Sequence, residues 1–263
     1  MTIGTDVSPP AEPPFTRDLP AHESRRLRAV AAREPDPEAA YRELARRRLE
    51  GEPLQYLEGT AAFGPLDLLV DRRVLIPRPE TEQLWELACR TVRDPRVVVD
   101  LGTGSGALAV ALATRFPGAR VLAVDASPDA AEVARTNAHR LRVDVEVLVG
   151  DLFDPLPIEL RGRVDLLVAN PPYVAEHEWD DLPSDVRREP REALVAGPEG
   201  TEVLDRIAAA APAWMALGGR VVCEIGDTQG AHCLRVFSDA GLVDVDVGQD
   251  LAGRDRFVLG RRR

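Results

Sequence analysis

The chain has 263 residues, of which 44% are hydrophobic and 29% are charged. These proportions are those of a globular protein rather than of a disordered or membrane one. At this length we expect one large domain with a small appendage rather than two equal domains. The net charge of −11 argues against direct nucleic-acid binding, because binding to a phosphate backbone needs many Lys and Arg side chains.

Neither a membrane segment nor a structural metal is indicated. No run approaches the ~18 to 20 apolar residues of a membrane span, and the first residues lack a signal pattern, so we expect a cytoplasmic protein that does not bind membranes. The three cysteines, Cys89, Cys223 and Cys233, show no C-x-x-C spacing, and the four histidines show no metal-ligand spacing. We expect reduced thiols, no metal site and a monomer.

Three short segments precede the main domain. Residues 1–20 contain five prolines among small polar residues and predict a flexible tail. Residues 21–58 predict a small helical region, with helices around Leu27–Val30 and Tyr41–Leu49 separated by a Pro-Asp-Pro break and ended by Gly51–Pro53. Residues 59–78 alternate apolar and polar side chains and predict a β-hairpin linker.

The hairpin prediction depends on two turn signals, Gly64-Pro65 and Asp71-Arg72, within the alternating stretch Phe63–Ile76. The hexapeptide Pro77–Glu82 then places acidic residues where a first helical turn favours them. We therefore expect the catalytic domain, residues 79–263, to begin with a helix.

Strand and helix patterns alternate through this domain. Strands are predicted at 97–100, 121–125, 143–149, 164–170, 220–225, 242–247 and 257–259, and helices at 107–115, 129–141, 203–217 and 231–240. Such alternation predicts an α/β fold whose mostly parallel sheet is covered by helices on both faces.

A glycine-rich turn follows the first of these strands. The sequence Asp100–Gly106 has glycine at positions 102, 104 and 106 and leads directly into a helix. Glycine lets the backbone turn tightly and come close to a ligand. The turn therefore indicates a cofactor site, although glycine also serves purely structural turns.

Two acids follow the next two strands. Asp125 comes about 20 residues after the glycines, where a carboxylate can accept hydrogen bonds from ribose hydroxyls, and Asp151 follows the third strand. Together with the turn they predict an adenine-nucleoside site. The glycine spacing differs from G-x-G-x-x-G, yet a dehydrogenase-like or nucleoside-binding module stays open, and each Asp alone also fits a solvated loop.

The tetrapeptide Asn170-Pro171-Pro172-Tyr173 closes the strand at 164–169, on the same sheet edge as the glycine turn. Two prolines make the turn stiff, so Asn170 Oδ1 and the Pro171 carbonyl can accept hydrogen bonds from one NH₂ group, while Tyr173 packs on a planar group. With a nucleoside cofactor nearby, this predicts methyl transfer from S-adenosylmethionine to a planar amide or amine nitrogen. A rigid strand-exit turn is the alternative.

Over about residues 51–260 the chain resembles the HemK/PrmC family of protein-(glutamine-N5) methyltransferases. The glycine turn and the Asn-Pro-Pro-Tyr tetrapeptide carry the resemblance, together with further blocks at 51–56, 75–82, 189–190, 193–194, 224–226 and 250–256. The resemblance implies a class I S-adenosylmethionine-dependent methyltransferase fold, with a seven-stranded, mostly parallel Rossmann-like sheet. It also implies methylation of the glutamine in the Gly-Gly-Gln motif of peptide-chain release factors, which would be the protein partner.

The resemblance also assigns residues. S-adenosylmethionine, released as S-adenosylhomocysteine, would contact the glycine turn, the strand-end acids and a roof segment: Asp100, Gly102, Thr103, Gly104, Gly106, Asp125, Ala126, Asp151, Leu152 and Asn170, with Arg78, Glu80 and Thr81 in the roof. Within this set, Asp100, Gly102 and Gly104 would hold the methionine end of the cofactor. Asp125 would hold the ribose, and Asp151 with Leu152 the adenine. The catalytic residues would be Asn170, Pro171, Pro172 and Tyr173.

The N-terminal region departs from the family pattern. Family members usually carry a compact helical bundle that helps to grip the release factor, whereas only about 30 residues before Gly51 have helical patterns here. A small-molecule N-methyltransferase of the same family therefore stays open. A DNA adenine N6-methyltransferase is a further alternative, since the same tetrapeptide can hold a flipped adenine, but the acidic charge disfavours it.

Overall fold

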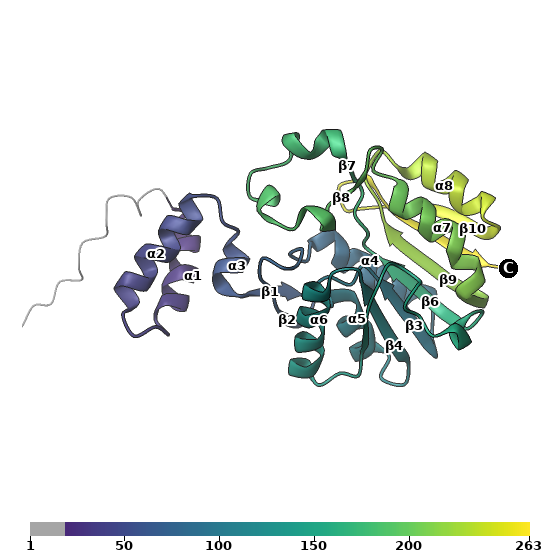
Figure 1. Ribbon diagram of the computed structural model, residues 1–263, viewed down its shortest axis with the longest axis horizontal. Helices are drawn as coiled ribbons and strands as arrows, with labels where there is room; N and C mark the ends of the chain where they lie inside the picture. Colours follow the sequence, from purple (N-terminus) through teal and green to yellow (C-terminus); the bar gives the residue numbers. More distant parts are fainter. Residues whose placement is uncertain (1–18) are drawn as a thin grey trace, which may run out of the picture. The chain divides into compact units, whose positions relative to one another are not determined.

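The computed structural model describes residues 19–263 (Figure 1), so the predicted tail falls almost entirely outside the described residues. The chain divides into two compact units, Met1–Glu58 and Gly59–Arg263, each considered by itself. Among residues 19–263 we find no helix that is both long and apolar enough to cross a membrane.

The first unit contains helices α1 (Ala21–Ala31), α2 (Pro37–Leu49) and α3 (Leu54–Glu58). Helix α2 begins where the Pro-Asp-Pro break predicts, because Asp36 caps it by accepting a hydrogen bond from Ala39 N (3.1 Å). The predicted helical region, 21–58, includes the residues of α3, but no separate helix was predicted at 54–58. This five-residue helix lies beyond what local pattern detects, because it buries Leu54 and Leu57 in the core formed with α1 and α2.

The second unit is built on a seven-stranded sheet in the order β10-β11-β9-β6-β3-β4-β5. The strands are β3 (Val97–Leu101), β4 (Arg120–Asp125), β5 (Glu146–Val149), β6 (Val164–Ala169), β9 (Met215–Glu224), β10 (Leu242–Gln249) and β11 (Asp255–Arg262). The pairs from β9 to β5 are parallel, and β11 runs antiparallel to both of its neighbours. The predicted mostly parallel α/β sheet is confirmed.

Helices cover both faces of this sheet (Figure 1): α4 (Pro79–Thr91), α5 (Ala107–Arg115), α6 (Pro128–Leu141), α7 (Glu202–Trp214) and α8 (Gly230–Asp239). Successive strand residues point to opposite faces, so Val98 packs into the core under α4 and α5, whereas Val99 packs into the core under α7 and α8. This two-sided burial explains why the central strands are apolar throughout.

The hairpin of β1 (Thr60–Phe63) and β2 (Leu66–Leu69) turns at Gly64-Pro65. Its predicted extent to Ile76 is too long. Residues 70–78 contain no strand, because Asp71 closes a local turn in which its carbonyl accepts from Val74 N (3.1 Å) and its carboxylate from Arg73 N (3.0 Å). Asn137 of α6 ties the hairpin down, since it bonds both Leu69 N and Leu69 O.

Two other predicted bounds also need correction. The helix predicted at 203–217 ends at Trp214, because Met215 takes an extended backbone (ψ 144°) and begins β9. Strand β5 begins at Glu146 rather than at 143, since Val143 N still bonds the Ala138 carbonyl at the end of α6. Both errors come from apolar residues that serve either element equally well.

Between β6 and α7 the chain forms two short strands and several helical turns. Strands β7 (Val174–Ala175) and β8 (Val195–Gly197) pair in parallel. The segment between them contains the 3₁₀ turns η3 (Glu176–Asp181), η4 (Val186–Arg188) and η5 (Arg191–Ala193); a further turn, η2 (Ile158–Leu160), precedes β6. This insertion follows the carboxyl end of β6, where ligands bind in open α/β sheets.

Candidate functional site

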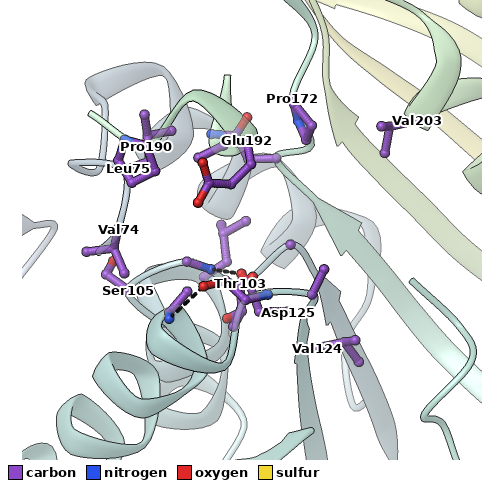
Figure 2. Close-up of a pocket in the computed structure, with 18 of the residues that line it drawn as sticks. Val74, Leu75, Thr103, Ser105, Val124, Asp125, Pro172, Pro190, Glu192 and Val203 are labelled. Carbon is purple, nitrogen blue, oxygen red and sulfur yellow. Dashed lines mark hydrogen bonds between the residues drawn. The ribbon is translucent and has the colours of Figure 1, made fainter. Parts of the chain in front are cut away.

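A cavity of about 310 Å³ opens at the carboxyl ends of the central parallel strands (Figure 2). Its floor is the glycine turn and the ends of β4 and β5, and its opposite wall carries Leu75, Pro190 and Glu192. Asn170 and Pro172 close a third side. Cavities of this size hold small molecules in other proteins.

The three glycines of the turn are needed for different structural reasons. All have positive φ (71°, 55° and 83° for Gly102, Gly104 and Gly106), which side chains disfavour. A Cβ on Gly104 would meet no atom within 4 Å, so this position faces open space. A Cβ on Gly106 would lie 3.2 Å from Ala134 of α6. The structure therefore places Gly106 in helix packing, and Gly102 and Gly104 on the cavity wall.

Asp100 lies beneath the turn rather than on the cavity wall. Its carboxylate is fully buried, and its Oδ2 accepts hydrogen bonds from the Thr103 hydroxyl (2.6 Å) and Ala109 N (3.2 Å). Its Oδ1 has no partner among residues 19–263. Burial raises the pKa of Asp100 to about 7. An unpartnered, buried carboxylate oxygen is costly, so a donor or a cation nearby would stabilise it.

Asp125 joins β4 to the glycine turn. Its Oδ2 accepts from Gly104 N (2.8 Å) and its Oδ1 from Ser127 N (2.9 Å), so the carboxylate is held rigidly on the cavity wall. Burial raises the pKa of Asp125, and the negative charge of Glu192 raises it further. Figure 2 shows Glu192 reaching from the opposite wall toward Asp125.

The third strand end is more open. Asp151 is more than half exposed and pairs with Arg206 of α7 (2.6 Å), and both residues line the cavity. Leu152 also lines it and adopts a left-handed backbone (φ 47°) that leucine disfavours. Ala126, the remaining predicted residue of this edge, lies on the cavity wall after Asp125.

A chain of hydrogen bonds holds the acceptor side together. Asn170 Nδ2 donates to Thr81 Oγ1 (2.9 Å), and the Thr81 hydroxyl donates to Glu224 Oε2 (2.9 Å). The Tyr173 hydroxyl donates to Glu224 Oε1 (3.3 Å). Glu224 is buried at the end of β9, and burial raises its pKa to about 7. Side chains from α4, β9 and the β6 exit thus meet at one carboxylate.

Tyr173 and Pro171 do not line the cavity beside the glycine turn, which we call the main cavity because the predicted cofactor residues gather there. Tyr173 lines a neighbouring cavity of about 330 Å³ together with Glu178, Gln229 and Arg256, and its carbonyl accepts from Gln229 Nε2 (2.9 Å). Burial raises the pKa of Tyr173, as does the charge of Glu224. Pro171 is buried behind the turn.

The predicted roof is divided. Thr81 lines the main cavity, whereas Arg78 forms an ion pair with Glu189, and Glu80 lies 3.7 Å from Arg254. Glu189 is buried, and its Oε2 also accepts from Ile76 N (2.9 Å). Burial raises the pKa of Glu189, although Arg78 opposes this. Arg78 therefore fastens the roof segment to the insertion instead of facing the cavity.

The sequence analysis missed Glu192, Arg206, Glu224 and Gln229 as site residues. Glu224 could have been found, because it ends the apolar run at 220–225 as Asp125 ends its own strand. Glu192 and Arg206 stand among other charged residues, and no local pattern distinguishes them. Within residues 19–263 no group of three His, Cys, Asp or Glu side chains is arranged to hold a metal ion.

The sequence is similar to those of known methyltransferases. Residues 86–221 match the family model described as the methyltransferase small domain. The chain is 47% identical to a release factor glutamine methyltransferase of Mycolicibacterium smegmatis over 90% of this chain and 85% of that protein. It is 42% identical to the protein of that name from Geobacter sulfurreducens, over 86% of this chain and 79% of the other.

The fold is similar to that of a solved methyltransferase from Pyrococcus furiosus (TM-score 0.57, 18% identity), over 82% of this chain and 96% of that one. This likeness concerns the fold, which agrees with the class I methyltransferase prediction.

Proposed function

Because the chain belongs to the release factor glutamine methyltransferase family, we propose that it transfers a methyl group from S-adenosylmethionine to the side-chain amide nitrogen of a release-factor glutamine, in the Gly-Gly-Gln motif. The observation that carries the proposal concerns the side-chain amide of Asn170. Asn170 lines the cavity above the glycine turn, and its Oδ1 forms no hydrogen bond with residues 19–263.

The main cavity fits S-adenosylmethionine. Gly104 leaves open space for a ligand to approach the backbone, and Asp100 keeps an unpartnered oxygen beneath the turn. Asp125, held by two backbone N–H groups, has lone pairs left for ribose hydroxyls. Leu152 and Val203 offer apolar surface to an adenine ring. In this proposal Asp151 and Arg206 form the rim of the adenine site.

The acceptor glutamine binds at the β6 exit. Asn170 Oδ1 and the Pro171 carbonyl accept no hydrogen bond from residues 19–263. Although Pro171 itself is buried, its carbonyl adjoins Pro172, which lines the cavity with Asn170, so in this proposal the two oxygens accept from the two N–H groups of one amide. An amide nitrogen is a poor nucleophile because its lone pair is delocalised. Fixing both N–H groups holds the nitrogen in the orientation for attack, and such alignment lowers the barrier by several kcal/mol.

S-adenosylmethionine, when bound, supplies a methyl group on a positively charged sulfur. As the nitrogen–carbon bond forms, the carbon–sulfur bond breaks, and the nitrogen loses one proton to solvent. The chain's part is positioning: Asn170 orients the nitrogen, and the backbone of the glycine turn brings the cofactor to the same strand edge. Glu192 adds a negative charge to the cavity, which favours a cationic ligand.

The test is incubation of the purified protein with S-adenosylmethionine and a full-length release factor, followed by mass spectrometry of the peptide that contains Gly-Gly-Gln. We expect one added methyl group on the glutamine and none in a release factor with Glu at that position. An unmodified glutamine would contradict the proposal. Methylation of DNA adenine or of free amides under the same conditions would instead support the alternatives.

A further inference from the structure

We propose that Thr81 and Glu224 are positioning residues that fix the direction of the Asn170 amide, so that the site accepts the N–H groups of an amide and rejects a carboxylate. The inference deepens the proposed function, because it explains how the same site distinguishes glutamine from glutamate. It rests on three hydrogen bonds that meet at the buried side chains of Thr81 and Glu224.

The direction of these bonds follows from Glu224. An ionised carboxylate only accepts hydrogen bonds, so the Thr81 hydroxyl must donate its single proton to Glu224 Oε2. The Thr81 oxygen is then left as an acceptor. Asn170 therefore has to present its NH₂ group to Thr81, as the structure shows, and not its carbonyl.

Fixing one end of the Asn170 amide also fixes the other. With Nδ2 bonded to Thr81, Oδ1 forms no hydrogen bond with residues 19–263, and Asn170 is one of the residues that line the cavity. A glutamine NH₂ can donate to this oxygen. A glutamate carboxylate would face it with a second acceptor, and two opposed acceptors repel.

Burial of Thr81 and Glu224 makes a reversal of the hydrogen-bond direction unfavourable. Thr81 is 4% exposed and Glu224 is 1% exposed, so water cannot readily replace a lost partner. Rotating the Asn170 amide would set its carbonyl against the Thr81 oxygen and lose the hydrogen bond between them. Helix α4 and strand β9 hold the two groups, which are 143 residues apart in sequence.

Glu224 is ionised above about pH 7. Burial raises its pKa to about 7, and the Thr81 hydrogen bond, Arg256 of β11 and the Tyr173 hydroxyl oppose this rise. When Glu224 gains a proton it can donate to Thr81, and the direction of the chain is no longer imposed.

The first measurement needs no substrate. The chain has only two asparagines, Asn137 and Asn170, so labelling with nitrogen-15 asparagine gives two side-chain NH₂ groups in an NMR spectrum. Asn137 also donates to two backbone carbonyls, of Leu69 and Ser105, and serves as the internal control. We expect the Asn170 signal to shift as pH passes through about 7 and the Asn137 signal to stay constant.

Variants identify the source of that shift. Glu224→Gln should abolish the pH dependence of the Asn170 signal, and Thr81→Val should expose its NH₂ group to solvent exchange, while Thr81→Ser retains the hydroxyl and the protection. Thr114→Val is the control for the loss of a threonine hydroxyl outside the site, since Thr114 is exposed and donates to Val110 O (2.8 Å) within α5. If neither the Thr81 variants nor Glu224→Gln changed the pH dependence or the solvent exchange of the Asn170 signal, the inference would be overturned.

The second measurement tests specificity. A release factor with Glu in place of the target glutamine is used as a competitive inhibitor of methyl transfer. We expect it to bind the wild type roughly 10-fold or more weaker than the glutamine form, and Thr81→Val to lose most of this discrimination, with Thr114→Val unchanged. Equal discrimination in Thr81→Val would contradict the inference. Absence of methyl transfer by the wild type would instead contradict the proposed function and leave the NMR result standing.

Discussion

The two sides of the main cavity are built in different ways. The glycine-turn part of the cofactor side is held by hydrogen bonds over short sequence separations: Thr103 bonds Asp100 three residues away, and Gly104 bonds Asp125 at a separation of 21. The acceptor side joins Asn170 to Thr81 across 89 residues and Thr81 to Glu224 across 143. Backbone turns make the first side, and buried side chains make the second. Changes on the acceptor side should therefore impair catalysis, and changes on the cofactor side should impair binding.

The largest effect is expected from Asn170→Ala. This change removes the acceptor for the glutamine N–H group and leaves the glycine turn intact, so kcat should fall roughly 100-fold or more. The Kd for S-adenosylmethionine, measured by calorimetry, should change less than about threefold. A loss of cofactor affinity as large as the loss of kcat would show that the two sides are not separable.

Gly200→Ala should damage the acceptor side through the backbone. Gly200 has φ 80°, and a Cβ there would lie 2.7 Å from the Tyr173 carbonyl and 2.9 Å from Ala175 N. The exit of β6 must shift to relieve this contact, and displacement of a reacting group costs on the order of 10-fold to 100-fold in rate. Gly118→Ala is the control, because a Cβ there meets no atom within 4 Å and its φ is not in the left-handed region. Steady-state kinetics of both variants measures the difference.

The next effect belongs to the cofactor side. Asp125→Ala should weaken S-adenosylmethionine binding about 10-fold to 100-fold, because a charged acceptor for the ribose hydroxyls is lost. Asp165→Ala is the matched control: Asp165 also accepts from two backbone N–H groups, of Arg96 and Val97, but does not line the cavity. Calorimetry should show weaker binding for Asp125→Ala alone. Equal losses would indicate that only fold stability is measured.

The cofactor side was the more predictable from sequence. The strand at 97–100, the glycine turn and the helix at 107–115 lie where local patterns put them, because hydrophobic period and glycine placement are local properties. The short helix α3 depends on its contacts with α1 and α2, which no local window of the sequence contains. The proposed roles of Gly106 and Asp100 were inferred from their motif, yet they lie in helix packing and beneath the turn.

The acceptor side shows what sequence reasoning lacks. Asn170 stood out because two prolines follow it, but nothing near it in sequence identifies Thr81 or Glu224 as its partners. Their meeting requires the pairing of β9 with β6 and the packing of α4 against β9. Glu192 is a similar case, since the insertion between β7 and β8 brings it to the cavity wall.

A smaller effect is expected on the cofactor side, in the pH dependence of fold stability that Asp100 causes. The folded-state pKa of Asp100 is raised from 3.8 to about 7 by burial, so its neutral form stabilises the fold below about pH 4 and this contribution is lost as pH rises through 7. Asp100→Asn stays neutral and can keep the bonds from Thr103 and Ala109. Its Tm relative to the wild type should therefore be higher by several degrees at about pH 8 than at about pH 5. A constant difference would contradict the burial argument.

The smallest effect is expected at the rim, from Arg206→Ala. Arg206 and Asp151 form a short ion pair, but 54% and 52% of their side chains are exposed, and exposed pairs contribute at most about 1 kcal/mol. Cofactor affinity should change less than about fivefold, and salt should reduce even that difference because it screens exposed charges. A larger, salt-independent loss would mean that Arg206 contacts the cofactor directly. The cofactor side would then depend on a distant side chain, as the acceptor side does, and the contrast between the two would narrow.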